Sequence, residues 1–165
     1  LQLVKRLRHA RRCHVTRARE LARRHVEHHA IAAAGRRARG GSTRHFAGIH
    51  DDCRGGRNQA DVDAGRFDCS SLVHYCYASA GIQLGPRESV TTWSLINMGK
   101  PVPASEMKRG DLIFFDTAGR NGHIGIYLGN GKFLNDSSTQ GVSIGDLNSA
   151  YWSRYFNGNV RRVVE

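Results

Sequence analysis

The chain has 165 residues, which is enough for one domain with a hydrophobic core, and it has no apolar run near the length of a membrane span. Residues 1–66 hold 16 basic and 6 acidic side chains, whereas residues 67–165 hold 9 and 8, so the first segment carries +10 of the formal charge of +11. This imbalance excludes a basic surface spread over the whole protein. We therefore divide the chain into a basic segment, residues 1–65, and a second part, residues 66–165.

Residues 1–34 contain no glycine or proline, and their apolar residues loosely follow helical spacing, as a basic helix would. We favour a solvated charged helix or a disordered tail over a nucleic-acid or membrane binder. Residues 35–66 are rich in Gly, Arg and Asp and predict a loop. The excess of Arg, Ala, Gly and His over Lys also resembles a GC-rich gene translated out of frame. The arginine-studded start lacks the pattern of a secretory signal peptide, but a chain that starts at Leu1 leaves the compartment open.

From Phe67 onward the chain shows regular patterns. Apolar residues at positions 72, 73, 76, 77 and 80 lie on one helical face, and Gly81 follows as a helix stop, so we predict a helix here. A short second helix is predicted around Val90–Asn97.

The remaining patterns predict strands. GDLIFFD (Gly110–Asp116) is typical of a buried strand, and GHIGIYLGNGKFLN (Gly122–Asn135) predicts two strands around a Gly-Asn-Gly turn. Gly141–Ile144 and Asn159–Val164 are candidates for further strands. One helix followed by several antiparallel strands indicates an α+β domain.

The cysteines lack Cys-x-x-Cys spacing, which indicates thiols with separate roles rather than a disulfide scaffold. They are Cys13, Cys53, Cys69 and Cys76. Cys69 lies at the predicted helix start, where unpaired backbone N–H groups and the helix dipole favour the nucleophilic thiolate. Asp68 and Ser70 are suited to capping this helix end. Cys76 lies on the apolar face and suits a buried structural role.

A thiol nucleophile needs an imidazole that takes and returns its proton, and a third group that orients the imidazole. Of the nine histidines, only His74 and His123 follow Cys69. His74 lies five residues later in the same predicted helix, whereas His123 opens a predicted strand. We therefore regard His123 as the better candidate for the proton carrier.

The predicted hairpin supplies a candidate for the third group. If Gly129-Asn130-Gly131 is a three-residue loop, Gly125 pairs with Asn135, and Asn135 shares a sheet face with His123. The amide oxygen of Asn135 would then accept the imidazole N–H. A two-residue loop would move Asn135 to the opposite face, and a plain turn-forming role next to Asp136 is the alternative.

Together these motifs resemble the NlpC/P60 cysteine peptidases, bacterial enzymes that cut peptidoglycan stem peptides. The resemblance covers Phe67–Val163 and rests on four stretches in order, which are FDCSSLV (Phe67–Val73), GDLIFFDT (Gly110–Thr117), GHIGIYLGNGKFLN and YWSRYFNGNVRRV (Tyr151–Val163). The chain is most similar to C-terminal peptidase domains of Gram-positive and conjugative-element cell-wall hydrolases, some of which carry a lysozyme-like domain upstream.

The resemblance implies a papain-like α+β domain, in which an N-terminal helix carries the cysteine and packs on an antiparallel sheet. It implies that Cys69 is the nucleophile, His123 the general base and then acid, and Asn135 the group that orients the imidazole. Asp68 and Ser70 match family positions near the amine and backbone of the substrate.

The resemblance also implies a function. The expected enzyme is a secreted or cell-envelope bacterial endopeptidase that hydrolyses peptidoglycan at a γ-D-glutamyl-diamino acid bond through a thioester on Cys69. We expect no metal, no organic cofactor, no specific nucleic acid and no transmembrane segment, and we expect a monomer.

The residues upstream of the cysteine depart from the family pattern. The family usually has a Tyr-x-Trp-Gly-Gly-like stretch there, whose tyrosine helps form the oxyanion site, but no Tyr or Trp precedes Cys69 and only Arg54–Gly56 matches. Two alternatives stay open. One is a catalytically weak module whose basic segment attaches it to anionic wall polymer or nucleic acid. The other is a zinc site with no familiar ligand spacing, made of Cys13, His25, His28, His29 and Cys53.

Overall fold

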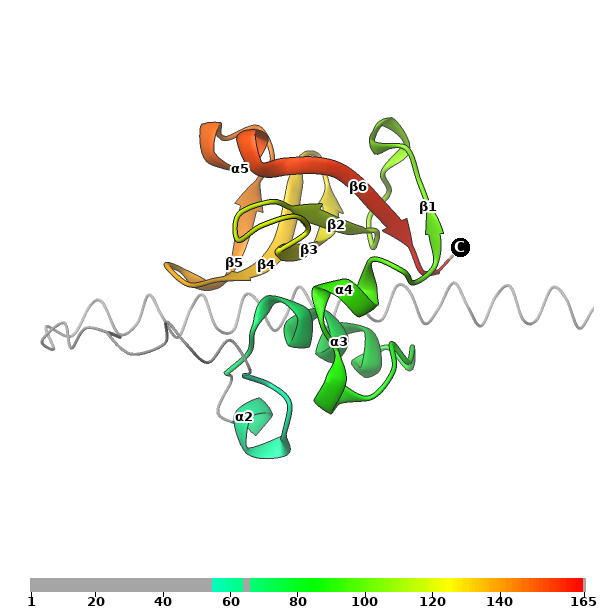
Figure 1. Cartoon of the computed structure of the whole chain (residues 1–165), viewed down its shortest axis with the longest axis vertical. Helices are drawn as coiled ribbons and strands as arrows, with labels where there is room; N and C mark the ends of the chain where they lie inside the picture. Colours follow the sequence, from blue (N-terminus) through cyan, green and yellow to red (C-terminus); the bar gives the residue numbers. More distant parts are fainter. Residues whose placement is uncertain (1–54, 64–65, 165) are drawn as a thin grey trace, which may run out of the picture.

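The computed structural model describes residues 55–63 and 66–164, in which an antiparallel six-stranded sheet has the strand order β1-β6-β2-β3-β4-β5. The strands are β1 (Lys100–Pro101), β2 (Leu112–Phe115), β3 (His123–Gly129), β4 (Lys132–Ser137), β5 (Gly141–Asp146) and β6 (Phe156–Arg162). Helices α3 (Cys69–Ser79) and α4 (Thr92–Leu95) lie on one side of the sheet, and α5 (Ala150–Tyr155) lies on the other (Figure 1). The predicted α+β arrangement, with the cysteine-bearing helix against an antiparallel sheet, is confirmed.

Helix α3 begins and ends where its sequence predicts. Asp68 is the N-cap, with an extended backbone (φ −104°, ψ 173°), and a capping box with Ser71 satisfies the backbone N–H groups of Ser71 and Asp68. Gly81 follows the C-cap with a φ of +77°, a conformation that glycine adopts without steric strain. These two signals place Cys69 in the first turn of the helix.

The sheet has an apolar cluster on each face because its central strand is buried on both sides. All four residues of β2 are fully buried, and they alternate between the two faces. Leu112 and Phe114 pack with helix α3, whereas Ile113 and Phe115 pack with Phe133 and the residues around α5. Helix α3 is thereby held against the face that Ile124, Ile126 and Leu134 also form.

The β3–β4 hairpin has the predicted register. Ile126 pairs with Leu134 and Tyr127 with Phe133, and the register shifts by one residue only at the turn. Asn130 and Gly131 both have positive φ, so the turn absorbs the extra residue without disturbing the strands. Alternation along the strands then puts His123 and Asn135 on the same face.

Two short helices lie where no helix is predicted. Helix α5 is capped by Ser149 and has only six residues, too few to show helical periodicity, and β6 then begins at Phe156 rather than Asn159. Helix α2 (Gln59–Asp63) lies within the predicted loop 35–66, where Asn58 accepts a hydrogen bond from the backbone of Asp61. Single-turn 3₁₀ helices span Arg87–Ser89 and Ala104–Glu106.

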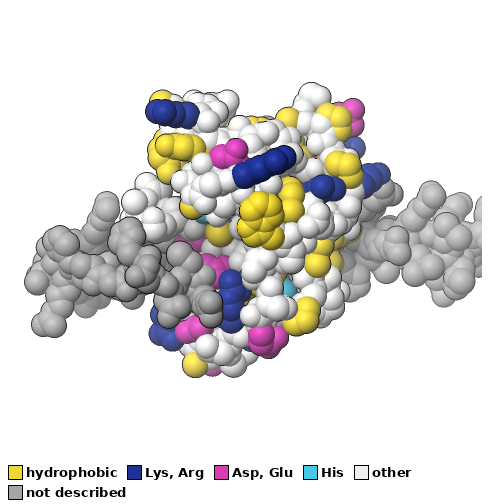
Figure 2. Space-filling model, in the orientation of Figure 1, with side chains coloured by type: hydrophobic (Ala, Val, Ile, Leu, Met, Phe, Trp, Pro, Cys, Tyr) yellow, Lys and Arg dark blue, Asp and Glu magenta, His cyan; other side chains and the backbone are white. Residues whose placement is uncertain are grey.

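The described part of the predicted basic segment contacts helix α3. A Cβ on Gly55 would lie 3.0 Å from the backbone of Phe67, and one on Gly56 would lie 2.6 Å from the hydroxyl of Ser71. Acidic and basic side chains lie next to one another around α2 (Figure 2), where Arg66 pairs with Asp61. The predicted boundary between residues 65 and 66 stays a prediction. No helix in residues 55–63 and 66–164 is long and apolar enough to cross a membrane.

Candidate active site

Cys69 is held at the junction of α3 and the sheet. It is the first residue of the helix, directly after the Asp68 cap, and its side chain is partly buried. The backbone N–H groups of Ile124 and Ser70 both point at its sulfur. Ile124 follows His123 at the start of β3, so the sulfur lies beside the strand that carries the candidate proton carrier.

The surroundings of Cys69 keep its thiol protonated. Burial raises its pKa to about 12, and the negative charges of Asp68 and Asp136 act in the same direction. The N–H groups of Ile124 and Ser70 lower the pKa, which is the effect that a helix start predicts, but desolvation outweighs them. The helix start thus favours the thiolate as predicted, but burial has the larger effect, which the sequence does not show because it does not reveal how deeply the first turn is covered.

Cys76 and His74 have structural surroundings. Cys76 is 5% exposed in the cluster beneath α3, and burial alone raises the pKa of its thiol to about 12. The Nε2 atom of His74 is 2.9 Å from the carbonyl oxygen of Gly85, on the loop that follows the helix. Neither side chain has the charged or exposed surroundings that a reactive group needs.

The imidazole of His123 is fixed by Asn135. Its Nε2 atom lies 3.1 Å from Oδ1 of Asn135, and both residues are buried. The amide nitrogen of Asn135 donates to the carbonyl oxygen of Ser143 at 3.2 Å, which turns the amide oxygen toward the imidazole. Nε2 is therefore the protonated nitrogen, and Nδ1 is left as the atom that can accept a proton.

Burial also determines the charge of the imidazole. It lowers the pKa of His123 below the ordinary value, and the hydrogen bond that Nε2 donates to Asn135 opposes this shift without cancelling it. His123 is thus neutral near pH 7. The resting site pairs a neutral thiol with a neutral imidazole, rather than a thiolate with an imidazolium.

Trp152 covers the imidazole and was not predicted as a site residue. Its ring stacks on His123 with 5.3 Å between centroids and 20° between planes, and it makes edge contacts with Phe115 and Phe133. The motif YWSRYFNGNVRRV contains this tryptophan, but the sequence offers no sign of what its ring would touch. Only the packing of α5 against β2 and β4 brings it to His123.

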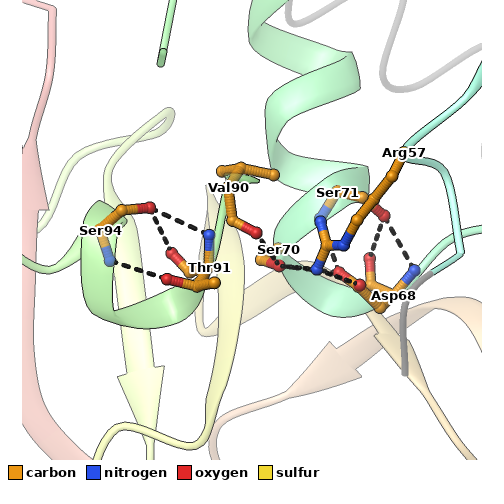
Figure 3. A network of polar contacts seen from close by, with 7 residues as sticks. All are labelled: Arg57, Asp68, Ser70, Ser71, Val90, Thr91 and Ser94. Carbon is orange, nitrogen blue, oxygen red and sulfur yellow. Dashed lines mark hydrogen bonds and ion pairs between the residues drawn. The ribbon is translucent and has the colours of Figure 1, made fainter. Parts of the chain in front are cut away.

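Asp68 and Ser70 form a polar network at the helix start (Figure 3). Oδ1 of Asp68 accepts hydrogen bonds from the Ser71 backbone at 2.8 Å and from the Ser70 hydroxyl at 2.7 Å. Oδ2 of Asp68 accepts one from Arg57 at 2.6 Å. The predicted cap is confirmed for Asp68, whereas Ser70 donates to Asp68 instead of capping the backbone. Arg57 is a residue that the sequence patterns missed.

A second carboxylate lies on the helix side of the sheet. Asp136 follows Asn135 on β4 and shares the face of Leu134, which packs against α3. Burial, and then the charge of Asp68, raises the pKa of Asp136 to about 7. This carboxylate is therefore partly protonated at neutral pH.

The zinc hypothesis stays a prediction that the structure does not test. The five candidate ligands lie outside the described residues. Within residues 55–63 and 66–164, no three His, Cys, Asp or Glu side chains gather in a group that could hold a metal ion.

Comparison with known proteins agrees with this geometry. Residues 48–161 match the NlpC/P60 family. The chain is 61% identical over 111 residues to the peptidoglycan DL-endopeptidase CwlO of Bacillus licheniformis, covering 67% of this chain and 24% of that protein. It is 42% identical over 101 residues to the murein DD-endopeptidase MepH of Escherichia coli, covering 59% of this chain and 36% of that protein. The chain therefore spans well under half the length of these two relatives.

Solved structures show the same fold. An NLP/P60 family protein from Staphylococcus aureus, described as similar to a lipoprotein, superposes with a TM-score of 0.54 at 31% identity, covering 67% of this chain and 35% of that one. An NlpC/P60 family protein from Bacillus cereus gives a TM-score of 0.51 at 30% identity, covering 61% of this chain and 32% of that one.

Proposed function

Because this chain belongs to the NlpC/P60 family, we propose that it is a cysteine endopeptidase that hydrolyses the stem peptides of peptidoglycan. The observation that carries the proposal is the hydrogen bond between His123 on β3 and Asn135 on β4. The N–H group of Ile124, the residue after His123, points at the sulfur of Cys69. A buried, oriented imidazole beside a thiol is the arrangement that nucleophilic acyl transfer requires. The names of the two curated relatives, both endopeptidases of peptidoglycan or murein, support the substrate class.

In the proposed mechanism His123 activates the thiol. Nδ1 accepts the proton of Cys69 as the sulfur attacks the carbonyl carbon of the scissile bond, because neither group is charged beforehand. The imidazolium then gives that proton to the leaving amine, and a thioester on Cys69 remains. His123 next takes a proton from water as the water oxygen attacks the thioester. The imidazolium then returns this proton to the leaving sulfur, which restores the thiol as the acid product departs. Asn135 holds the imidazole in the tautomer that this sequence needs.

We propose the γ-D-glutamyl-diamino acid bond as the cleaved bond. It joins a D-residue to the L-centre of the next residue, which fits the DL-endopeptidase in the name of the 61% identical relative better than the DD-endopeptidase in the name of the 42% identical one. A substrate of this kind places the enzyme outside the cytoplasmic membrane or in the envelope. We expect it to act as a monomer, without a metal or organic cofactor.

Purified peptidoglycan, incubated with the full chain, tests the activity and the bond together. Mass spectrometry should find new peptides that end in D-glutamate and new amines on the diamino acid. Fragments that arise only by loss of a D-alanyl cross-link would contradict the bond assignment. Salt-dependent binding to peptidoglycan with no released peptide would contradict the enzyme and favour the weak binding module.

Substitution of the two described cysteines tests the nucleophile. Cys69→Ala should lower the rate of peptide release by at least about a thousandfold, because the covalent step is lost. Cys76→Ala removes a thiol from the core and should lower thermal stability while keeping hydrolysis within about threefold. Equal hydrolysis by Cys69→Ala and the parent would rule out this mechanism.

A further inference from the structure

Arg57 makes a partly buried ion pair with the residue that precedes the candidate nucleophile. Its Nη2 atom lies 2.6 Å from Oδ2 of Asp68, and the side chains of the two residues are only 17% and 9% exposed. The same Nη2 is 3.5 Å from the hydroxyl of Ser70, so Arg57 reaches both residues that flank Cys69 in the sequence. Figure 3 shows Arg57 approaching the start of α3 from the side opposite to Val90.

The backbone before Arg57 is shaped for this approach. Gly56 has a φ of +77° and is buried against Phe67 and Ser71, where a Cβ would lie 2.7 Å and 2.6 Å from their side chains. A residue with a side chain would therefore push this stretch away from the helix. The contact between Gly56 and the helix start thus determines where the guanidinium of Arg57 lies.

The ion pair completes the hydrogen bonding of Asp68. Oδ1 is already used by the Ser71 backbone and the Ser70 hydroxyl, and Oδ2 is used by Arg57. With Arg57 in place, the carboxylate is held from both oxygens and cannot turn. Without Arg57, Oδ2 would lose the hydrogen-bond partner that it has among the described residues.

Stability alone explains this pair poorly. Nη1 of Arg57 is buried and makes no hydrogen bond within the described part of the chain. A buried ion pair with an unsatisfied donor costs desolvation that its attraction often does not repay. A role in setting the charge around the thiol accounts for its presence.

The charges around Cys69 indicate that Arg57 would favour its thiolate form. Asp68 precedes the thiol, and the charge of Asp136 on β4 acts on it. His123, in neutral form, precedes Ile124, whose N–H group points at the sulfur. The two carboxylates both disfavour the thiolate, and Asp68 also disfavours ionisation of Asp136. The positive charge of Arg57, paired with Asp68, opposes the negative charge of the two carboxylates.

We propose that Arg57 is a positioning residue, which holds the carboxylate of Asp68 at the start of α3 and offsets its charge beside Cys69. The inference rests on the proposed role of Cys69 as nucleophile. Its test measures the reactivity of the thiol itself, so it gives an answer even if the protein hydrolyses nothing.

The test compares Arg57→Gln with Arg66→Gln in the full chain. Each removes one positive charge from an ion pair with an N–O distance of 2.6 Å, but the side chain of Arg66 is 62% exposed and its partner is Asp61. Alkylation of Cys69 by iodoacetamide is followed from pH 6 to 11, with mass spectrometry of the peptide that contains Cys69. Arg57→Gln should shift the profile to higher pH and slow alkylation at pH 7 about three- to tenfold. Arg66→Gln should stay within about twofold of the parent.

Two further variants separate positioning from loss of folding. Arg57→Lys keeps the charge and should recover alkylation to within about threefold of the parent. Asp68→Asn keeps a good N-cap, and in that background Arg57→Gln should change alkylation less than it does in the parent, because the carboxylate that Arg57 holds is gone. An unshifted profile for Arg57→Gln, or an equal effect of Arg57→Gln with and without Asp68, would overturn the proposal. If Arg57→Gln does not fold, Arg57→Lys decides the proposal, and alkylation more than about threefold slower than in the parent would overturn it.

Discussion

Each nitrogen of the His123 ring has a defined role in the structure. Nε2 donates to Asn135, and Asn135 is itself held by the carbonyl of Ser143. The ring is buried, which lowers its pKa, and a neutral ring is the form that can accept a proton. These facts together lead to a pH dependence that a solvent-exposed histidine would not have.

We predict that the acid limb of kcat/KM has its midpoint below 6.5, the ordinary value for histidine. In the proposed mechanism activity needs neutral His123, and a lowered pKa means that the ring stays neutral to lower pH before it is protonated and activity falls. Asn135→Ala removes the interaction that raises this pKa, so the midpoint should move lower still, while kcat falls about ten- to a hundredfold. A pH–rate profile of both proteins measures this. A midpoint above 6.5 in the parent would contradict the buried, neutral imidazole.

At the scale of elements, helix α5 is the part that completes the imidazole site. It contributes Trp152 to the face of His123 and packs Tyr155, partly buried, against the same cluster. The tryptophan covers one face of the ring and so limits both its rotation and the access of water to the bond with Asn135.

Trp152→Leu should lower kcat about tenfold or more and leave KM within about threefold, because an unstacked imidazole spends less time in the reactive orientation. Trp152→Phe retains a stacking ring and should recover most of the loss. The control is Trp93→Leu on α4, a tryptophan that is 59% exposed. Steady-state kinetics on a soluble stem peptide would measure all three variants. An equal loss in Trp93→Leu would show that a general effect on stability is responsible.

The β3–β4 hairpin depends on a glycine opposite Asn135. A Cβ on Gly125 would lie 2.7 Å from the ring of Phe133 and 2.8 Å from the carbonyl oxygen of Leu134, and neither group has room to move in the core. Gly125→Ala should therefore lower the free energy of unfolding by about 1–3 kcal/mol, as overpacking does elsewhere. Urea denaturation followed by circular dichroism measures it. An unchanged midpoint would mean that the hairpin adapts more freely than this packing allows.

At the scale of the whole molecule, the two parts of the chain differ in charge, and the described part of the first contacts the second. Gly56 and Arg57 pack on the start of α3, although their composition predicts a loop of a basic segment. A polar, glycine-rich stretch can pack in this way because its contacts are an ion pair and a close backbone approach, which hydrophobic patterning does not reveal.

Limited proteolysis of the native chain tests this contact. Trypsin needs an accessible arginine, and the side chain of Arg57 is 17% exposed whereas that of Arg66 is 62% exposed. We expect the limiting fragment to retain Arg57 uncut. A resistant fragment that begins at Phe67 would instead support the predicted boundary between residues 65 and 66, and would show that residues 55–65 detach readily.

The sequence by itself determined the features that depend on neighbours along the chain. The start of α3 at Cys69 follows from Asp68 and Ser71, and the pairing of His123 with Asn135 follows from the length of the Gly-Asn-Gly turn. Only the tertiary structure decided that Arg57 reaches Asp68, that Trp152 stacks on His123, and that the Cys69 thiol is protonated. Caps and turns are local hydrogen-bonding patterns that a few residues specify. Burial, stacking and long-range ion pairs depend on which distant surfaces meet, and no short stretch of sequence encodes that.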